Sequence, residues 1–280
     1  MSNSSLAIRV NKMSGDRNIA CEDHVAVEEP LEIQLGAPTP EGAAAKSISI
    51  TMRTPGHDAE LALGFLYSED IISDSGQVAA VDHSGPPDSQ SGFRNVIRVV
   101  LKPDVVIDVG RLQRHFYTTS SCGVCGKASI DALRVTGRSS LRGTGVAYTR
   151  NLILDLPDKL LQQQRLFLQT GGLHAAALFD EQGEIVCVRE DVGRHNAVDK
   201  VVGSLFMGKQ LPAGKLGLLV SGRASFELMQ KALVAGLTTL VAVSAPSSLA
   251  VALAQEYGMT LVGFLRSGNF NIYSGEDRIR

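Results

Sequence analysis

Two cysteines separated by two residues are the clearest chemical signal in the sequence. They stand in the segment Cys122-Gly-Val-Cys125-Gly-Lys127. Glycines beside each thiol let backbone N–H groups approach the sulfur, and a helix expected from about residue 128 would place its positive end beside the pair. The Lys127 ammonium adds positive charge, and all three effects favour the nucleophilic thiolate. We predict that Cys122 attacks an activated sulfur and becomes a persulfide, which Cys125 can release by exchange.

The same spacing allows three other interpretations. A thioredoxin-like redox pair normally lies where a strand meets a helix, whereas this pair follows a loop rich in serine and threonine. Half of a zinc site would need two further ligands; Cys187 and His115 are available, but no second CxxC or paired-histidine motif exists. Two small residues in a tight turn would need no chemistry. We expect no metal site, and the spacing alone does not choose among the remaining interpretations.

A second group of polar residues, Asp191 to Asn196, lies between an expected strand and an expected helix. Parallel α/β folds bind ligands at the carboxyl ends of strands, and helix N-termini there favour anions. Asp191 could equally be the N-cap of that helix, with His195 a solvated residue of its first turn. The triplet Arg194-His195-Asn196 carries more hydrogen-bond donors than capping requires. We therefore predict that Arg194 and His195 bind a ligand.

Small or polar loops follow three more expected strands. In the first, at residues 221–225, Arg223 could clamp a phosphate while small neighbours let backbone N–H groups approach it. This loop lacks both GxxxxGK[ST] and GxGxxG, so neither a nucleoside triphosphatase nor a Rossmann site is predicted. The other two loops are residues 244–248 and 264–269. Four such loops at one edge of a sheet predict a pocket for a large phosphorylated ligand.

The first part of the chain is expected to form a small α+β domain. Short β-branched segments predict strands, and apolar residues at helical spacing predict one helix. The strands are expected at residues 25–27, 31–35, 47–52 and 95–101, the helix at 58–72 after a cap at Asp58, and a short helix near 109–116. The first ~20 residues have little pattern, and the stretch 73–91, rich in Ser, Gly, Pro and Asp, is expected to be a surface loop.

The last part of the chain alternates helices and strands regularly, beginning with a helix expected at residues 157–168. This pattern predicts an α/β fold with a mostly parallel sheet covered on both faces. We divide the chain into an N-terminal α+β domain (1–117), a linker that carries the two neighbouring cysteines (118–146) and an α/β domain (147–280).

The composition favours a cytoplasmic protein that works with proteins or small molecules. The 27 Lys and Arg residues nearly balance 29 Asp and Glu residues, and no long basic tract appears, so nucleic acid is not an expected partner. No apolar run reaches the roughly 18 residues of a membrane span, and the N-terminus does not resemble a secretory signal. Four scattered cysteines do not make the disulfide framework of a small secreted protein.

Several segments together resemble the FdhD family, the formate dehydrogenase accessory sulfurtransferases. They are Cys122-Gly-Val-Cys-Gly-Lys, Gly172-Leu-His-Ala-Ala, Arg189-Glu-Asp-Val-Gly-Arg-His-Asn-Ala-Val-Asp-Lys200, Ser221-Gly-Arg-Ala-Ser-Phe-Glu, Leu261-Val-Gly-Phe, Asn271-Ile-Tyr and Thr54-Pro-Gly-His-Asp-Ala-Glu-Leu-Ala-Leu-Gly-Phe-Leu66. The resemblance covers nearly the whole chain. It implies a protein that accepts sulfur from a cysteine desulfurase and passes it to the bis(molybdopterin guanine dinucleotide) form of the molybdenum cofactor, before formate dehydrogenase receives the cofactor.

The resemblance also implies a homodimer whose larger domain is a three-layer α/β/α unit with the cytidine deaminase fold. By position, Cys122 matches the persulfide-bearing cysteine and Cys125 its neighbour. The cofactor-binding loop matches Phe264, Leu265, Arg266, Ser267, Gly268 and Asn269, and a basic residue often stands in the family where this chain has Asn269. Together with the strand-end loops, this implies that Arg194, His195, Arg223 and Arg266 hold the pyrophosphates or guanines. Two alanines follow His174, so the H-x-E signature of zinc deaminases is missing and a hydrolytic zinc centre is not implied.

Overall fold

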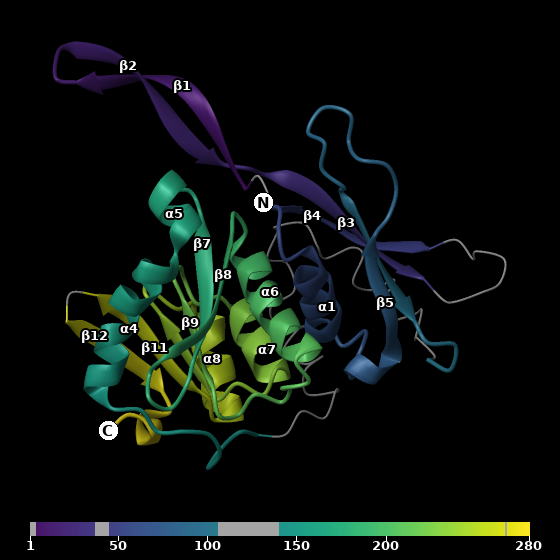
Figure 1. The fold of residues 1–280 in the computed structure, drawn as a ribbon. Coiled ribbons are helices and arrows are strands. Elements are labelled where there is room, and N and C mark those ends of the chain that lie inside the picture. Colours follow the sequence, from purple (N-terminus) through teal and green to yellow (C-terminus); the bar gives the residue numbers. More distant parts are fainter. Residues whose placement is uncertain (1–3, 37–44, 106–139, 267) are drawn as a thin grey trace.

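The computed structural model describes residues 4–36, 45–105, 140–266 and 268–280. The described residues form a mixed α/β fold with a six-stranded sheet, a four-stranded sheet and a two-stranded hairpin (Figure 1). Cys122, Cys125, Lys127, Ser267 and the short helix expected near 109–116 lie outside the described residues.

The six-stranded sheet has the order β12-β11-β10-β9-β7-β8. Its strands are β7 (His174–Phe179), β8 (Ile185–Asp191), β9 (Gly217–Val220), β10 (Thr239–Ala242), β11 (Thr260–Arg266) and β12 (Asn269–Ser274). Strands β9, β10 and β11 run parallel, whereas β7 is antiparallel to both of its neighbours and β12 is antiparallel to β11. The expectation of a mostly parallel sheet was therefore wrong. Short connections join β7 to β8 and β11 to β12, and such connections join antiparallel neighbours only.

Helices cover both faces of this sheet, giving three layers (Figure 1). Consecutive strand residues alternate between two apolar clusters, with Leu218, Leu240 and Leu261 in the first cluster. Leu219, Val241 and Val262 belong to the second cluster. The first face is covered by α6 (Arg194–Met207), α7 (Phe226–Val234) and α8 (Ser248–Tyr257), and the second by α4 (Arg150–Gln163).

The helix expected at 157–168 begins earlier and is interrupted. The Thr149 side chain accepts a hydrogen bond from the Leu152 N–H, which caps α4 about two turns before Pro157. Pro157 is held inside α4, where the apolar side chains of Ile153, Leu156 and Leu160 are buried. The chain breaks at Gln164 and continues as α5 (Arg165–Thr170). Tertiary packing here outweighs the low helix propensity of proline.

The four-stranded sheet has the order β4-β3-β6-β5 and packs beside a single helix. Its elements are β3 (Glu29–Gly36), β4 (Lys46–Arg53), α1 (Asp58–Ser68), β5 (Val78–His83) and β6 (Val96–Leu101). Strand β5 and a short 3-10 turn (Ser75–Gln77) occupy the segment expected to be a surface loop. The β5 sequence has little β-propensity, but as an edge strand it needs only one partner, β6. The N-cap of α1 is His57 rather than Asp58.

The first residues form a long hairpin rather than a patternless segment. Strand β1 (Ser5–Ser14) pairs with β2 (Arg17–Ala26) over its whole length, and the hairpin extends away from the body of the molecule (Figure 1). Gly15 has φ 58° in the two-residue turn, a conformation that glycine adopts without strain. The base of the hairpin contacts α5 through Gln169, whose side-chain nitrogen lies 3.1 Å from His24 Nδ1.

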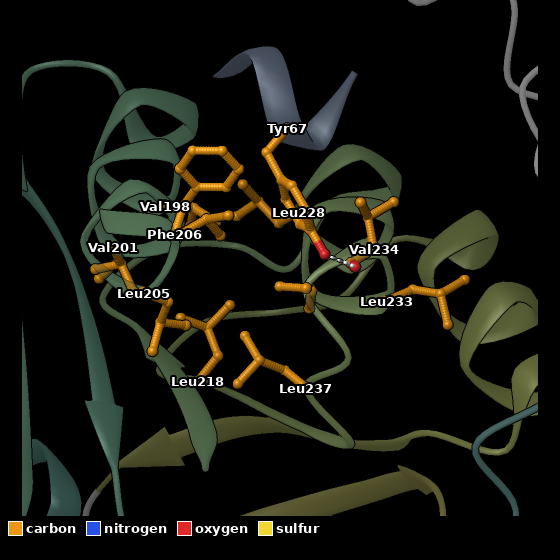
Figure 2. Close-up of a cluster of buried hydrophobic side chains, with 14 of the residues drawn as sticks. Tyr67, Val198, Val201, Leu205, Phe206, Leu218, Leu228, Leu233, Val234 and Leu237 are labelled. Carbon is orange, nitrogen blue, oxygen red and sulfur yellow. Dashed lines mark hydrogen bonds between the residues drawn. The ribbon is translucent and has the colours of Figure 1, made fainter. Parts of the chain in front are cut away.

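One hydrophobic cluster runs through the N-terminal and C-terminal parts of the chain. Helix α1 lies against α6, and the Tyr67 ring is 5.6 Å from that of Phe206. The Tyr67 hydroxyl donates a hydrogen bond of 3.2 Å to the Val234 carbonyl (Figure 2). The domain boundaries at 117 and 147 stay a prediction, but the two flanking parts share this core. Among the described residues, no helix is long and apolar enough to cross a membrane.

Candidate functional site

The four loops that follow β8, β9, β10 and β11 lie side by side where these strands end. We call this side of the six-stranded sheet, at the carboxyl ends of those four strands, the strand-end edge. Strand β8 is antiparallel to β7, which is antiparallel to β9, so β8 ends on the same edge as the three parallel strands. Backbone hydrogen bonds join neighbouring loops. Ala224 N–H donates to Ala245 O over 3.2 Å, and Phe264 N–H donates to Ser244 O over 3.1 Å. The fold thus brings together the segments that the sequence analysis placed at strand ends.

Cationic side chains gather at this edge around His174, the first residue of β7. Burial, and then the positive charges of Arg194, His195 and Arg223, lower the pKa of His174. Gly222 closes against it, since a Cβ atom at this position would lie 3.3 Å from His174 Nδ1. His174 was not among the binding residues predicted from the sequence. Its place in the segment Gly172-Leu-His174, directly before a strand, was the available signal.

Polar atoms in this cluster are shielded from water without partners. Arg194 Nε, His195 Nε2 and Ser225 Oγ have no hydrogen-bond partner among the described residues. His195 Nε2 lies 3.9 Å from Glu227 Oε2, which is within ion-pair range but too long for a hydrogen bond. Buried polar atoms normally have a partner, and those without one point to an absent ligand or water. The donors Arg194 and His195 suit an anion here.

The last residues of β11 have a strained backbone at the same edge, where their pairing with β12 is irregular. Phe264 has φ 54°, which is uncommon for a residue other than glycine and concentrates at functional sites. The Arg266 guanidinium lies 5.6 Å from the centre of the Phe264 ring, and Gly268 and Asn269 are exposed. Leu265 is buried in the second apolar cluster. The whole residue is 1% exposed, so Leu265 is not accessible to a ligand.

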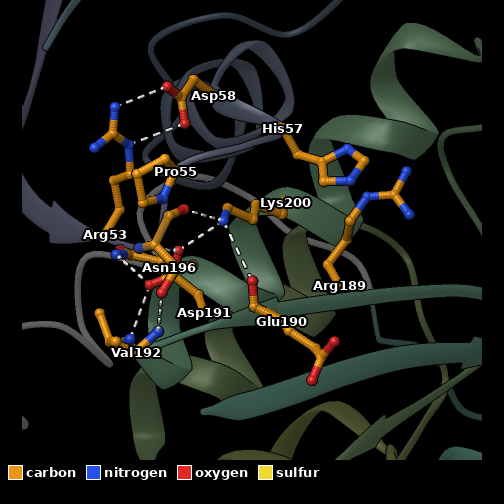
Figure 3. A network of polar contacts seen from close by, with 12 residues as sticks. Arg53, Pro55, His57, Asp58, Arg189, Glu190, Asp191, Val192, Asn196 and Lys200 are labelled. Atoms are coloured by element: carbon orange, nitrogen blue, oxygen red, sulfur yellow. Dashed lines mark hydrogen bonds and ion pairs between the residues drawn. The ribbon is translucent and has the colours of Figure 1, made fainter. Parts of the chain in front are cut away.

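Asp191 belongs to a buried polar network rather than to this edge (Figure 3). Its carboxylate accepts hydrogen bonds from the N–H groups of Gly193, at 2.8 Å, and Thr54, at 3.2 Å, and its Oδ2 lies 2.7 Å from Lys200 Nζ. Asn196 Nδ2 donates to Asp191 Oδ1 and to the Met52 carbonyl. The N-cap of α6 is Gly193, so Asp191 as the cap residue was wrong.

Within the motif 189–200, some residues hold the fold together and others are left to bind a ligand. Asp191, Asn196 and Lys200 join the segment after β4 to the start of α6. Asn196 therefore has no donor left for a ligand, although it stands next to Arg194 and His195. Besides Asp191, its partners are Met52 and Thr51, which lie 144 and 145 positions away in the sequence, so no local pattern could have shown this.

A second polar group joins α1 to β8. The Arg189 guanidinium bonds both oxygens of Glu60, at 2.5 and 2.7 Å, and His57 Nδ1 lies 3.2 Å from the same carboxylate. Burial raises the pKa of Glu60, but the hydrogen bonds from Arg189 and His57 outweigh this effect and lower that pKa to about 2. A cavity of about 180 Å³ beside this group is lined by His57, Arg189 and Lys200. It is lined by none of the four strand-end loops, whose Arg223 and Arg266 lie on the open surface.

Among the described residues, no three His, Cys, Asp or Glu side chains are placed to hold a metal ion together. Cys187 on β8 is half-buried, with its sulfur 3.5 Å from Ser204 Oγ. His115, like Cys122 and Cys125, lies outside the described residues, so the thiol chemistry of the linker stays a prediction from sequence.

Comparison with known proteins decides the family. The model of the FdhD/NarQ family matches residues 26–280. The chain belongs to the FdhD/NarQ family. It is 53% identical to the sulfur carrier protein FdhD of Streptomyces coelicolor, over 92% of this chain and 89% of that protein. It is 47% identical to the sulfur carrier protein FdhD of Mycobacterium tuberculosis, over 97% of both chains. The family resemblance drawn from the sequence is confirmed.

A solved structure shares the fold of this FdhD/NarQ chain. It is a crystal structure described as a formate dehydrogenase accessory protein from Desulfotalea psychrophila, with a TM-score of 0.74 and 22% identity over 99% of both chains. The family match begins at the last residue of β2, so the projecting hairpin precedes almost all of the matched FdhD/NarQ region.

Proposed function

We propose that this protein is a sulfurtransferase that carries sulfur as a persulfide on Cys122. The sulfur would come from a cysteine desulfurase and pass to the bis(molybdopterin guanine dinucleotide) form of the molybdenum cofactor, before formate dehydrogenase receives that cofactor. The single observation that carries this proposal is the 53% identity, over most of the chain, to a relative named sulfur carrier protein FdhD. The proposal also includes a cytoplasmic homodimer whose α/β part has a cytidine deaminase-like fold.

The sulfur chemistry rests on the linker sequence. The Cys122 thiolate would attack the outer sulfur of the donor persulfide; the new S–S bond forms as the old one breaks, and the donor leaves as a thiolate. Lys127 and local backbone N–H groups favour the thiolate that makes this attack. Cys125, three residues away, can release the carried sulfur if its thiolate attacks the inner sulfur, on Cys122; the Cys122–Cys125 disulfide forms as the S–S bond of the persulfide breaks, and the outer sulfur leaves as hydrosulfide.

The ligand site proposed for the cofactor is the edge formed by the four strand-end loops. Arg194 and His195 have shielded donor atoms without a hydrogen-bond partner in the part of the chain that the structure describes, and Arg223 lies in the neighbouring loop. Arg266, Gly268 and Asn269 continue this surface two strands away. Ser267 belongs to the same loop but lies outside the described residues. Guanidinium groups and helix N-termini are suited to the pyrophosphates of a dinucleotide.

The carrier step is tested by intact mass after incubation with a cysteine desulfurase and cysteine. Wild type should gain one sulfur atom that reductant removes, and Cys122→Ala should not. Cys187→Ala is the matched control, because Cys187 is half-buried in β8 and should leave the gain unchanged. Loss of the gain in Cys187→Ala alone would contradict the assignment to Cys122.

The same experiment separates two other functions. A thiol–disulfide oxidoreductase would lose the mass of two hydrogen atoms as Cys122 and Cys125 form a disulfide and pass two protons and two electrons to a disulfide substrate, and it would gain no sulfur. A binding chaperone without sulfur transfer would show no mass change in any form, yet would still bind a guanine nucleotide. Either result would replace the sulfurtransferase proposal.

A further inference from the structure

An exposed carboxylate lies among the cationic side chains of the strand-end surface. Glu227, in the first turn of α7, places Oε2 3.9 Å from His195 Nε2, and its side chain is 54% exposed. The His195 ring beside it lowers the pKa of Glu227 to about 2, so the group is an anion at neutral pH. Arg194, His195 and Arg223 gather around neighbouring His174. If the surface bound only phosphate, this negative charge would lower its affinity for that ligand.

An ion pair with His195 does not account for the carboxylate. Its separation is longer than a hydrogen bond, and exposed ion pairs contribute little stability. His195 Nε2 itself is without a hydrogen-bond partner among the described residues. His195, the Ser225 hydroxyl and the backbone N–H of Glu227 all lower the pKa of this carboxylate, but a carboxylate has about four acceptor sites. The exposed Glu227 carboxylate can therefore still accept hydrogen bonds from a ligand that also brings anionic groups to the cations.

Guanine has the edge that such a carboxylate recognises. Its N1–H and 2-amino donors lie side by side, so one carboxylate can accept both, as it does from a guanidinium. Adenine has an unprotonated nitrogen at the corresponding ring position, which would face the carboxylate as a second acceptor. Hypoxanthine keeps N1–H but lacks the 2-amino donor. A carboxylate at this position therefore distinguishes three purines by hydrogen bonding alone.

We propose that Glu227 is the residue that selects guanine, by accepting hydrogen bonds from N1–H and the 2-amino group of the bound nucleotide. This inference rests on the proposed function, which supplies a guanine dinucleotide as ligand. The phosphates then face the cations of the same surface. Arg223 lies four residues before Glu227 in the same segment, and Arg266 follows β11, two strands from β9. Two strand spacings are roughly 10 Å, the scale of a nucleoside diphosphate.

Isothermal titration of the full-length protein with GDP, IDP, ADP and pyrophosphate tests the assignment. Wild type should bind GDP at least about tenfold more tightly than IDP, because IDP cannot make one charge-assisted hydrogen bond. Glu227→Gln should bind GDP and IDP within about twofold of each other, since the amide can accept from only one donor and opposes the second. Its affinity for pyrophosphate should be equal or higher, because a negative charge is removed.

Two further variants separate hydrogen bonding from charge. Glu227→Asp keeps the charge but withdraws the carboxylate, and should lose preference for GDP over IDP without gaining affinity for pyrophosphate. Glu181→Gln removes an equal charge from the turn between β7 and β8, at the opposite edge of the sheet, and should behave as wild type. Circular dichroism and the melting temperature confirm that each variant is folded.

The outcomes also distinguish this inference from the proposed function. If Glu227→Gln keeps the wild-type preference for GDP over IDP, or if wild type has no such preference, Glu227 does not select guanine and the nucleotide site remains. If wild type binds neither GDP nor pyrophosphate, the nucleotide-binding part of the proposed function fails, and the role of Glu227 fails with it.

Discussion

Replacing Gly203 by alanine should destabilise the protein, although alanine is the better helix former. Gly203 lies where α6 crosses α1, and its counterpart on α1 is Gly64. A Cβ atom at Gly203 would lie 2.5 Å from the Glu60 carbonyl carbon and 2.8 Å from Glu60 Cα. These are backbone atoms of the facing helix, so no side chain can turn aside to make room.

The expected magnitude follows from two opposing terms. Alanine gains about 1 kcal/mol of helix propensity over glycine. Ordinary carbon–carbon contacts are about 3.5–4.0 Å, so α1 and α6 would have to separate by roughly 1 Å, and overpacking of this kind costs about 1–3 kcal/mol or more. Because the crossing has backbone on both sides, we expect the upper end, and a net loss of about 2 kcal/mol. This corresponds to a fall of about 4–8 °C in melting temperature.

Differential scanning calorimetry of wild type and Gly203→Ala, with Gly214→Ala as control, measures this effect. A Cβ at Gly214 would have its nearest neighbour, the Gly236 carbonyl oxygen, at 3.7 Å, which is ordinary contact. The control should stay within about 0.5 kcal/mol of wild type. A Gly203→Ala variant that is as stable as wild type, or about 1 kcal/mol more stable as propensity alone predicts, would refute backbone contact at this crossing.

Three further predictions concern the buried network, acid stability and the ligand surface. Lys200→Met leaves the fully buried Asp191 carboxylate without its cation and should cost about 3–5 kcal/mol in urea unfolding, whereas Lys159→Met, which removes an exposed pair with Glu184, should cost less than about 1 kcal/mol. The folded pKa of Glu60 is about 2 against an ordinary 4.5, so its stabilisation is present above pH 4.5 and is lost as pH falls towards 2; Glu60→Gln should flatten the measured dependence of stability on pH in that window. The double variant Arg194→Ala/Arg223→Ala should weaken GDP binding at least about tenfold, and unchanged affinity would contradict the placing of the phosphates.

Local sequence patterns predicted the elements that place the ligand surface. Apolar residues at helical spacing in α6 and α7 and β-branched residues in β8 and β10 are local features, and the structure has a helix or a strand in each place. The loop at 221–225 was found for the same reason, because it directly follows β9. The loop expected at 264–269 was too long, since residues 264–266 end β11 and Asn269 begins β12. The specific motifs along the chain were enough to identify the family.

The elements that the sequence analysis missed depend on distant partners. Strand β5 has a weak pattern and forms because β6 offers it an edge. The hairpin β1–β2 has its turn signal in Gly15-Asp16, but its ten pairs bury no continuous core. The antiparallel pairing of β7 with β9 could not be predicted, because the periodicity of a strand does not show its direction relative to a distant partner.

The residue types at the ligand surface were determined by sequence, and their roles were decided by tertiary structure. Arg194, His195 and Asn196 are adjacent and similar in hydrogen-bonding capacity, yet only Asn196 is used internally, by Met52 and Asp191. Leu265 lies in the expected cofactor loop, yet its side chain packs into the core. The physical reason is that a side chain's partner is set by whichever segment the fold brings against it, and those segments lie far away in the chain.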